Sequence, residues 1–225
     1  MKRLDDLDTL QRLCSSAYFK EIFSESVQKH AVLFLCEQGE TLLKQNGHSA
    51  YLFYLPHGRC KVSYLTANAK TIIVNQLKGP CLIGEMELFN EKESFTVESL
   101  EESLLVGFPL AECEKMLKED VRFLQHVCLE LSVKERNNAR RLLHAFSYPL
   151  KNRLARFILD YAEQDTLRIK KVTIAESLGV SYRHLESVMD DFVKDGILAK
   201  DRLVYRLCDR KALEELSGEL RDGLF

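Results

Sequence analysis

The side chains best suited to recognition chemistry lie between residues 181 and 187. Arg183 carries a planar guanidinium, which pairs in two places with the O6 and N7 acceptors of guanine. Four neighbours add hydrogen-bonding groups, and they are Tyr182, His184, Glu186 and Ser187. Donors and acceptors on one polar face of a segment can read base edges in the major groove of DNA. We predict base contacts from these five residues, with Arg183 as the strongest candidate.

Hydroxyl and basic side chains around this segment are candidates for contacts with the DNA backbone. Phosphate oxygens accept hydrogen bonds from such groups, which position a protein on the duplex without reading its sequence. The candidates are Lys170, Lys171, Ser181, Lys200, Arg202 and Arg206. For the basic residues, a role as solvated surface charge stays open beside the phosphate role.

The spacing of residues 174–192 predicts two short helices joined by a tight turn. Four apolar residues recur at i, i+3, i+4 and i+7 along a helix over residues 181–193, and they are Leu185, Val188, Met189 and Phe192. Gly179 suits the sharp turn before this helix, because glycine adopts positive φ readily. Ser181 can cap the helix by accepting a backbone N–H. The polar residues then lie opposite the apolar stripe, as in a DNA-reading helix-turn-helix.

The elements around this pair of helices favour DNA binding over an ordinary pair of packed helices. The first helix has two candidate starts, one near Lys170 and one at a capping box formed by Thr173 and Glu176. The second helix ends at Gly196. A turn at residues 200–202 and a strand at residues 203–207 follow. A helix-turn-helix followed by a β-wing is a winged helix-turn-helix.

Residues 30–108 have the pattern of a β-sheet protein. The apolar, β-rich runs are Val32–Leu35, Tyr51–Leu55, Cys60–Leu65, Thr71–Val74 and Leu104–Phe108. Glycines between the runs supply turns, so a sandwich, jelly roll or barrel is expected. One or two amphipathic helices are predicted within residues 4–29, and a short helix over Leu110–Leu117.

Residues 121–145 contain neither glycine nor proline and predict one long helix. At about 1.5 Å per residue, the helix would be about 40 Å long. A helix of that length between two small domains needs a partner for its apolar stripe, and pairing with a second copy about a two-fold axis is the simplest arrangement. The candidate dimer contacts are Leu124, Val127, Leu131, Asn138 and Leu142, although Asn138 also fits a plain exposed position.

These elements define an α+β chain with three parts. We predict a jelly-roll-like β-roll with N-terminal helices over residues 1–118 and a connecting and dimerisation helix over residues 119–147. A winged helix-turn-helix domain is predicted over residues 148–225. The boundary is placed at Pro149, because proline disfavours helix in the preceding residue and readily begins a new one.

Composition agrees with a globular protein of the cytoplasm. The chain has 225 residues, 46% of them hydrophobic, and no apolar run of the roughly 18 residues that would span a membrane. Residues 1–6 lack the apolar core of a signal peptide. The net charge of −2 conceals a charge of +3 over residues 148–211, and phosphate affinity depends on such a local basic face.

The cysteines and histidines do not have the spacing of a metal or catalytic site. The seven cysteines include no CxxC pair, so we interpret them as small buried hydrophobes, with a redox-sensing thiol as the alternative. A cupin-like metalloenzyme is the rival from another class. It would need clustered ligands, whereas His30, His48 and His57 are scattered. We predict no catalytic residue and no metal site.

The order of these parts resembles the Crp/Fnr family of bacterial transcription regulators. Residues 37–62 resemble the family's cyclic-nucleotide-binding domain, and Ile83–Phe89 resembles the start of its phosphate-binding cassette. Residues 80–88, 149–159 and 178–185 look closest to the YeiL-like branch. The resemblance implies a homodimer on an inverted-repeat DNA site, RNA polymerase as a further partner, and an effector pocket near Gly84, Glu85 and Ser94.

Departures from the family pattern bear on the effector. Nucleotide-binding members end the cassette in Arg-Ser or Arg-Thr, whereas Glu93 stands at the arginine position here and would repel a phosphate. Iron–sulfur members carry an N-terminal cysteine cluster, whereas only Cys14 lies in that region. We therefore expect neither cAMP nor an iron–sulfur cluster. Three alternatives stay open for the effector. It is a different small molecule, it is a redox signal, or the regulator has no effector.

Overall fold

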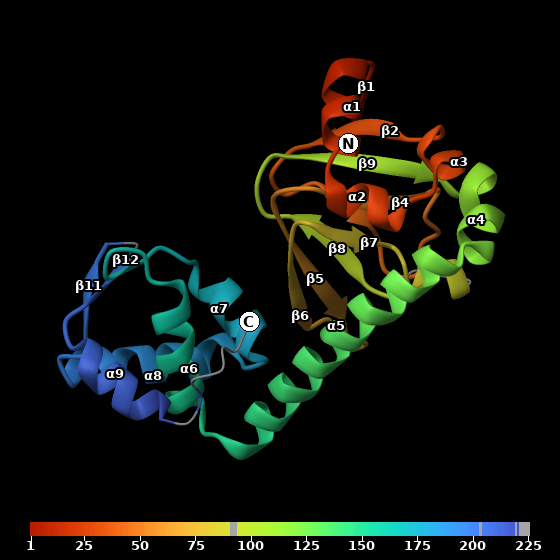
Figure 1. The fold of residues 1–225 in the computed structure, drawn as a ribbon. Helices are drawn as coiled ribbons and strands as arrows, with labels where there is room; N and C mark the ends of the chain where they lie inside the picture. Colours follow the sequence, from red (N-terminus) through yellow and green to blue (C-terminus); the bar gives the residue numbers. More distant parts are fainter. Residues whose placement is uncertain (91–93, 203, 219, 221–225) are drawn as a thin grey trace. The chain divides into compact units, whose positions relative to one another are not determined.

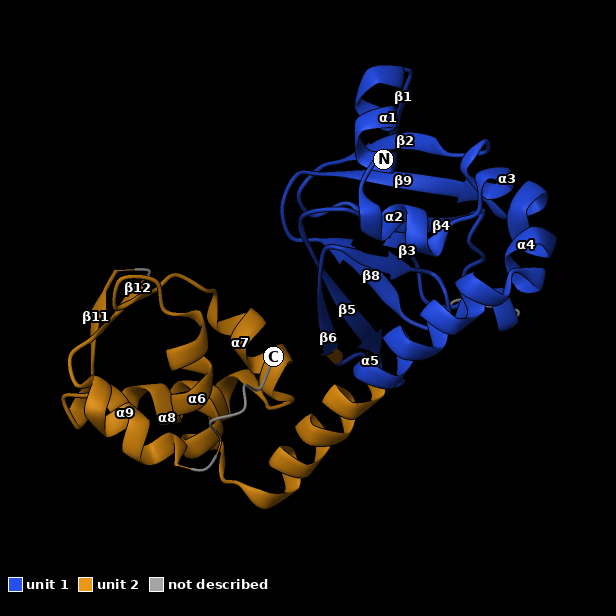
Figure 2. Cartoon of the chain, in the orientation of Figure 1, with its two compact units in different colours: residues 1–70, 74–134 blue, residues 71–73, 135–225 orange. Residues whose placement is uncertain are grey.

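The computed structural model describes residues 1–90, 94–202, 204–218 and 220 (Figure 1). The chain divides into two compact units, residues 1–70 with 74–134 and residues 71–73 with 135–225 (Figure 2). Each unit is described by itself below. No described helix is both long and apolar enough to cross a membrane.

The strands of residues 1–109 form two sheets. They are β1 (Lys2–Leu4), β2 (Val32–Cys36), β3 (Thr41–Leu43), β4 (Tyr51–Leu55), β5 (Arg59–Leu65), β6 (Thr71–Lys78), β7 (Cys81–Ile83), β8 (Thr96–Ser99) and β9 (Ser103–Pro109). Within the described residues, one sheet has the order β1-β2-β9-β4-β7 and the other the order β3-β8-β5-β6. Every predicted strand is confirmed. β1, β3, β7 and β8 were not predicted, because three or four residues are too short to show a clear alternation.

Strand β4 shows how the first unit is layered. Alternate side chains of a strand point to opposite faces of its sheet. Phe53 and Leu55 enter a core shared with residues of the other sheet, such as Val97, whereas Leu52 and Tyr54 enter a core covered by helices. The β-roll is thus a two-sheet structure with a helical layer on one outer face.

Helices cover that outer face. They are α1 (Leu7–Cys14), α2 (Ala17–Ile22), α3 (Glu25–Gln28), the short 3-10 helix η1 (Glu87–Phe89), α4 (Leu110–Glu119) and α5 (Val121–Ser147). Phe19 and Phe23 pack with Phe108 of β9 and Phe123 of α5 in one aromatic cluster. The predicted helix after the last strand is confirmed as α4, and the long helix as α5.

The apolar residues predicted to form one stripe on α5 do not all face the same way. Phe123 and Val127 are buried in the core under the helical layer. Leu124 and Leu131 are partly buried against that core, and Asn138 is exposed. Val127 is 2% exposed within its own chain and offers little surface to a partner, so its role as a dimer contact stays a prediction that this burial does not favour.

Residues 148–220 build a small helical unit with a sheet. Its elements are α6 (Leu150–Tyr161), β10 (Thr166–Leu167), α7 (Lys171–Leu178), α8 (Tyr182–Lys194), β11 (Leu198–Asp201), β12 (Val204–Leu207) and α9 (Arg210–Ser217). The described strands have the order β10-β12-β11, all antiparallel. α7 begins after Lys170, so the earlier of its two candidate starts is right. β10 was not predicted.

Candidate functional site

The turn between α7 and α8 has the geometry that its sequence predicts. Gly179 has a φ of 68°, in the left-handed region. The Gly179 N–H donates to the Glu176 carbonyl at 3.3 Å, and the Val180 N–H donates to the Ala175 carbonyl at 3.0 Å. These bonds satisfy the carbonyls at the end of α7 and reverse the chain toward α8.

A residue that sequence analysis missed also holds this turn. The Arg153 guanidinium of α6 donates to the Leu178 carbonyl at 2.8 Å and to the Tyr148 carbonyl at 3.3 Å. Burial lowers the pKa of Arg153 below its usual range. No local pattern marks this role, because the accepting carbonyl lies 25 residues further along the chain.

Helix α8 begins at a side-chain cap. The Ser181 Oγ accepts the His184 N–H at 3.2 Å, which confirms the predicted N-cap. Its role as a phosphate contact stays a prediction. Leu185, Met189 and Phe192 are fully buried in the core of this unit, whereas Val188 is only half-buried. The helix thereby presents its polar side outward.

Two polar residues on this outward side, Tyr182 and Glu186, contact Lys171 of α7. The Lys171 ammonium is 2.8 Å from Glu186 Oε1 and 5.8 Å from the centroid of the Tyr182 ring. The Tyr182 hydroxyl also donates to Glu186 Oε1, at 3.5 Å. The hydrogen bond from Lys171 holds the pKa of Glu186 below its ordinary value.

This cluster gives Lys171 a partner within the chain. Its side chain is only 17% exposed and pairs within the chain, because α7 begins there and lies beside the first turns of α8. The role of Lys171 as a phosphate contact stays a prediction. The same ammonium contacts both Glu186 and Tyr182.

Arg183 has no such partner. Together with His184 and Ser187 it is exposed on the outward side of α8. Within the part of the chain that the structure describes, neither an ion pair nor a hydrogen bond engages its guanidinium. Arg183 is thus a cation near the N-terminus of the helix, with its donors available to a ligand.

The wing places the remaining basic candidates. Lys200 lies in strand β11 rather than in the predicted turn, and it is exposed. Arg202 follows with a φ of 50°, and Arg206 of β12 lies 3.7 Å from Asp201. Leu203, predicted to begin the second wing strand, lies outside the described residues. The phosphate roles of Lys170, Lys200, Arg202 and Arg206 stay predictions.

The residues predicted for the effector pocket are bound by other residues of the chain. Glu85 is 4% exposed, and its Oε1 lies 2.5 Å from the Lys134 ammonium of α5. The Ser94 N–H donates to the Glu87 carboxylate at 3.2 Å. Gly84 has a φ of 91°, which favours glycine. Glu93 lies outside the described residues.

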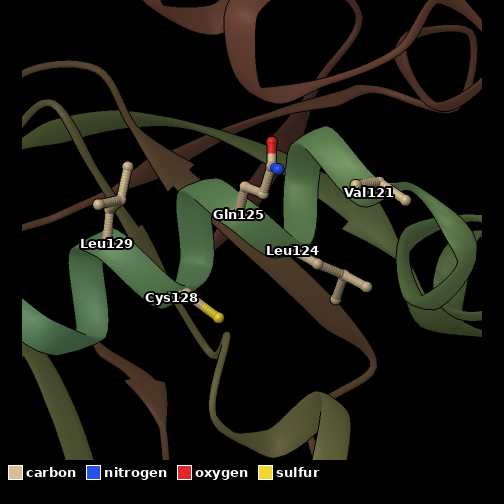
Figure 3. A pocket seen from close by; sticks show the side chains of 5 residues that line it. All are labelled: Val121, Leu124, Gln125, Cys128 and Leu129. Carbon is tan, nitrogen blue, oxygen red and sulfur yellow. The ribbon is translucent and has the colours of Figure 1, made fainter.

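The outer side of α5 carries an apolar hollow (Figure 3). The hollow measures about 460 Å³ and is lined by Val121, Leu124, Gln125, Cys128 and Leu129. Leu129 is 69% exposed and Val121 65% exposed. Further along the helix, Leu142, Leu143 and Phe146 are also exposed. A helix of a water-soluble unit does not normally leave so many large apolar side chains uncovered.

Comparison with known proteins agrees with both units. Residues 34–120 match the family model of the cyclic nucleotide-binding domain, and residues 152–216 match that of the Crp-like helix-turn-helix domain. The chain is 35% identical over 207 residues to the regulatory protein YeiL of Escherichia coli, which covers 92% of this chain and 94% of that protein. The chain belongs to the Crp/Fnr family of transcription regulators.

Solved structures of this family have the same fold. A Crp/Fnr regulator from Eubacterium rectale superposes with a TM-score of 0.78 at 18% identity, covering 92% of this chain and 97% of that one. A CRP-family regulator from Thermus thermophilus gives 0.70 at 19% identity, covering 85% and 98%. This chain is a DNA-binding regulator and not an enzyme, so the cupin-like metalloenzyme alternative is wrong.

The name of the matched N-terminal domain implies a cyclic nucleotide, and the residues present do not fit one. The buried carboxylate of Glu85 is bound by Lys134. The Ser94 N–H donates to the Glu87 carboxylate and is therefore not available to a phosphate oxygen. A cyclic phosphate brought here would face carboxylates, at an electrostatic cost. Sequence and structure thus disfavour this ligand for separate reasons.

The seven thiols differ in burial. Burial raises the pKa of Cys14, Cys36 and Cys113 to about 11 and that of Cys60 and Cys81 to about 12. Cys128 and Cys208 are exposed. Because the thiolate is the nucleophile, we expect iodoacetamide at pH 8 to label Cys208 in the native protein and to leave the five thiols of raised pKa unlabelled. Mass spectrometry of peptides checks this, with urea-unfolded protein as the control in which all seven react. Rapid labelling of Cys60 or Cys81 in the native protein would contradict the buried assignment.

Proposed function

We propose that this Crp/Fnr regulator is a homodimer that binds an inverted-repeat site in double-stranded DNA through helix α8 of each copy, and that it does so without cAMP. The observation that carries the proposal is Arg183, a cation without an internal partner among the described residues, on the outward side of a capped helix. Arginine at such a place is the side chain that most often reads guanine in the major groove.

The cluster around Glu186 supports a reading role for the rest of the helix face. Lys171 restrains Glu186, and the Tyr182 hydroxyl donates to the same carboxylate. Restrained side chains lose less conformational entropy on binding than free ones. Glu186 still has acceptor capacity for the N4 donor of cytosine. Tyr182, His184 and Ser187 complete the proposed base contacts.

The exposed side of α5 supports self-association. Leu129 and Cys128 join the predicted Leu142 in the proposed contact, and Leu124 and Leu131 keep part of their surface for it. The predicted Asn138 is also exposed on α5. Two such helices paired about a two-fold axis would cover each other's apolar side chains. In a dimer of this kind, two reading helices enter successive major grooves about 34 Å apart.

Selection of binding sites from a random pool of double-stranded DNA tests the proposal. Purified protein without added effector should enrich an inverted repeat with one half-site for each copy. Enrichment of a single, unrepeated motif would contradict the dimer. Absence of any enriched motif, with and without cell extract, would contradict sequence-specific binding by this chain.

Replacing Arg183 by alanine should weaken binding to the selected site by about 1–3 kcal/mol and relax the preference at one base position of each half-site. The reason is loss of a bidentate contact to guanine without loss of phosphate contacts. Fluorescence anisotropy with the selected site and with four substituted sites measures both effects.

Lys194→Ala is the matched control, because Lys194 is a cation on the same helix at the opposite end and is 76% exposed. The affinity of the Lys194→Ala protein for the selected site should match that of the unsubstituted protein. An equal loss by Arg183→Ala on every DNA sequence would assign Arg183 to phosphate contact instead of base reading.

A further inference from the structure

A chain of buried charges links the loop after β7 to helix α5. The Lys134 ammonium donates to Glu85 Oε1 at 2.5 Å and to the Leu82 carbonyl at 3.2 Å. It also lies 3.6 Å from Glu130 Oε1, one turn back on its own helix. The Leu82 N–H donates to that same Glu130 oxygen at 3.0 Å. One ammonium is therefore shared between the loop and the helix.

The side chains of this cluster are largely shielded from water. The exposed fractions are 5% for the Glu85 side chain, 14% for Glu130 and 18% for Lys134. An ammonium has three donors, and here three acceptors surround it. Burial alone would lower the pKa of Lys134, but Glu85 and Glu130 outweigh burial and leave that pKa above its ordinary value. Lys134 is thus a charged group inside a site of opposite charge.

The cluster continues on its other side toward α2. His126 Nε2 lies 3.7 Å from Glu130 Oε2 and is hydrogen-bonded to the Tyr18 hydroxyl at 3.1 Å. Burial lowers the pKa of His126 and raises that of Glu130. A neutral imidazole at this position leaves Lys134 as the cation that balances the two carboxylates.

Lys134 also has a distinctive place along α5. It is the last residue of the helix that belongs to the first compact unit, and residues 135–140 are all exposed. The same ammonium that binds the loop therefore belongs to the last residue of α5 in that unit. A change at this point acts on the loop and on the helix together.

We propose that the Lys134 ammonium is a built-in occupant of the loop after β7 that contains Gly84 and Glu85. The ammonium holds this loop against α5 and makes DNA binding independent of an added small molecule. Two carboxylates and one carbonyl surround this ammonium. Such a set of three acceptors matches the three donors of a primary ammonium ion. The proposal rests on the proposed DNA-binding function. It explains why the loop carries the buried Glu85 while its surroundings do not suit a cyclic nucleotide.

Chemical rescue tests this inference directly. Lys134→Ala removes three methylenes and the ammonium, a shape that n-propylammonium restores. We expect the variant to unfold several degrees lower than the unsubstituted protein and to bind the selected inverted repeat at least about tenfold more weakly. Adding n-propylammonium should recover a large part of both losses. Tetramethylammonium, which has the same charge but no N–H donor, should recover neither.

Arg136→Ala is the matched control, since it removes a cation two residues away at an exposed position. Its thermal midpoint and its DNA affinity should match those of the unsubstituted protein. If Lys134→Ala does not fold, the triple variant Glu85→Gln, Glu130→Gln, Lys134→Met replaces the cluster by neutral groups of similar size. That variant should fold and should still bind DNA at least about tenfold more weakly than the unsubstituted protein.

Other outcomes would overturn the inference. A lower thermal midpoint with unchanged DNA affinity would reduce the cluster to a stabilising ion pair. Loss of DNA affinity without rescue by n-propylammonium would exclude an ammonium site. Binding by the unsubstituted protein only after cell extract is added would overturn independence from an effector while leaving the proposed DNA-binding function intact. Failure to bind any DNA would overturn both.

Discussion

Replacing Leu129 by glutamate should convert the proposed dimer into a monomer and weaken binding to the full inverted repeat by about 100-fold or more. Leu129 is 69% exposed in the single chain and lines the apolar hollow on α5 (Figure 3). A carboxylate on this face would be desolvated in the dimer without a cation to pair with. Losing the second half-site removes the gain in affinity that comes from linking two binding modules, which is typically about 10²–10⁴.

Two measurements check this expectation. Light scattering should show a mass falling from twice 26.0 kDa to 26.0 kDa. Binding to a DNA with one half-site should stay unchanged, because α8 is untouched. Asn137→Glu adds the same charge at an exposed polar position of α5 and should leave the dimer intact. A Leu129→Glu protein that remains dimeric would show that α5 is not the contact.

Replacing Phe192 by alanine should lower the free energy of unfolding of the DNA-binding unit by about 3–5 kcal/mol. Phe192 is 0% exposed at the centre of the core beneath α8, and the Lys151 ammonium lies 5.7 Å from its ring centroid. The substitution leaves a cavity that helices on every side can only partly close. Because the same core positions α8, affinity for the selected DNA site should fall as well.

Urea unfolding, monitored by circular dichroism, measures the loss in free energy of unfolding from the transition of the C-terminal unit. Lys194→Ala, two residues along the same helix and exposed, should change that free energy by less than about 0.5 kcal/mol. A loss below about 1 kcal/mol for Phe192→Ala would mean that the ring is not part of a packed core. Arg183→Ala provides a second contrast, since it should reduce DNA affinity while leaving stability unchanged.

Much of the fold follows from local rules of the chain. The apolar period around Leu185 determines which side of α8 is buried, since residues three and four apart share one face of a helix. Gly179 and Ser181 shape the turn because of their own conformational and capping preferences. The uninterrupted stretch from residue 121 predicts α5 because nothing in it breaks a helix.

Local rules do not predict the short strands, nor which apolar residues of α5 are buried and which are exposed. Val127 and Leu129 are both apolar residues of one helix, yet Val127 is 2% exposed and Leu129 is 69% exposed. Periodicity shows that a helix has apolar residues, but it does not show which of them face the chain's own sheet. That depends on where α5 lies against the β-roll.

The sequence by itself determined the family's architecture, the helix-turn-helix and the residue types on its reading face, because each depends on neighbours a few positions apart. Only the tertiary structure decided which charges are free. Lys171 meets Glu186 across 15 positions, and Lys134 meets Glu85 across 49, so neither pairing leaves a mark in the local pattern. Folding brings these charges together, and it leaves Arg183 exposed on the outward side of α8.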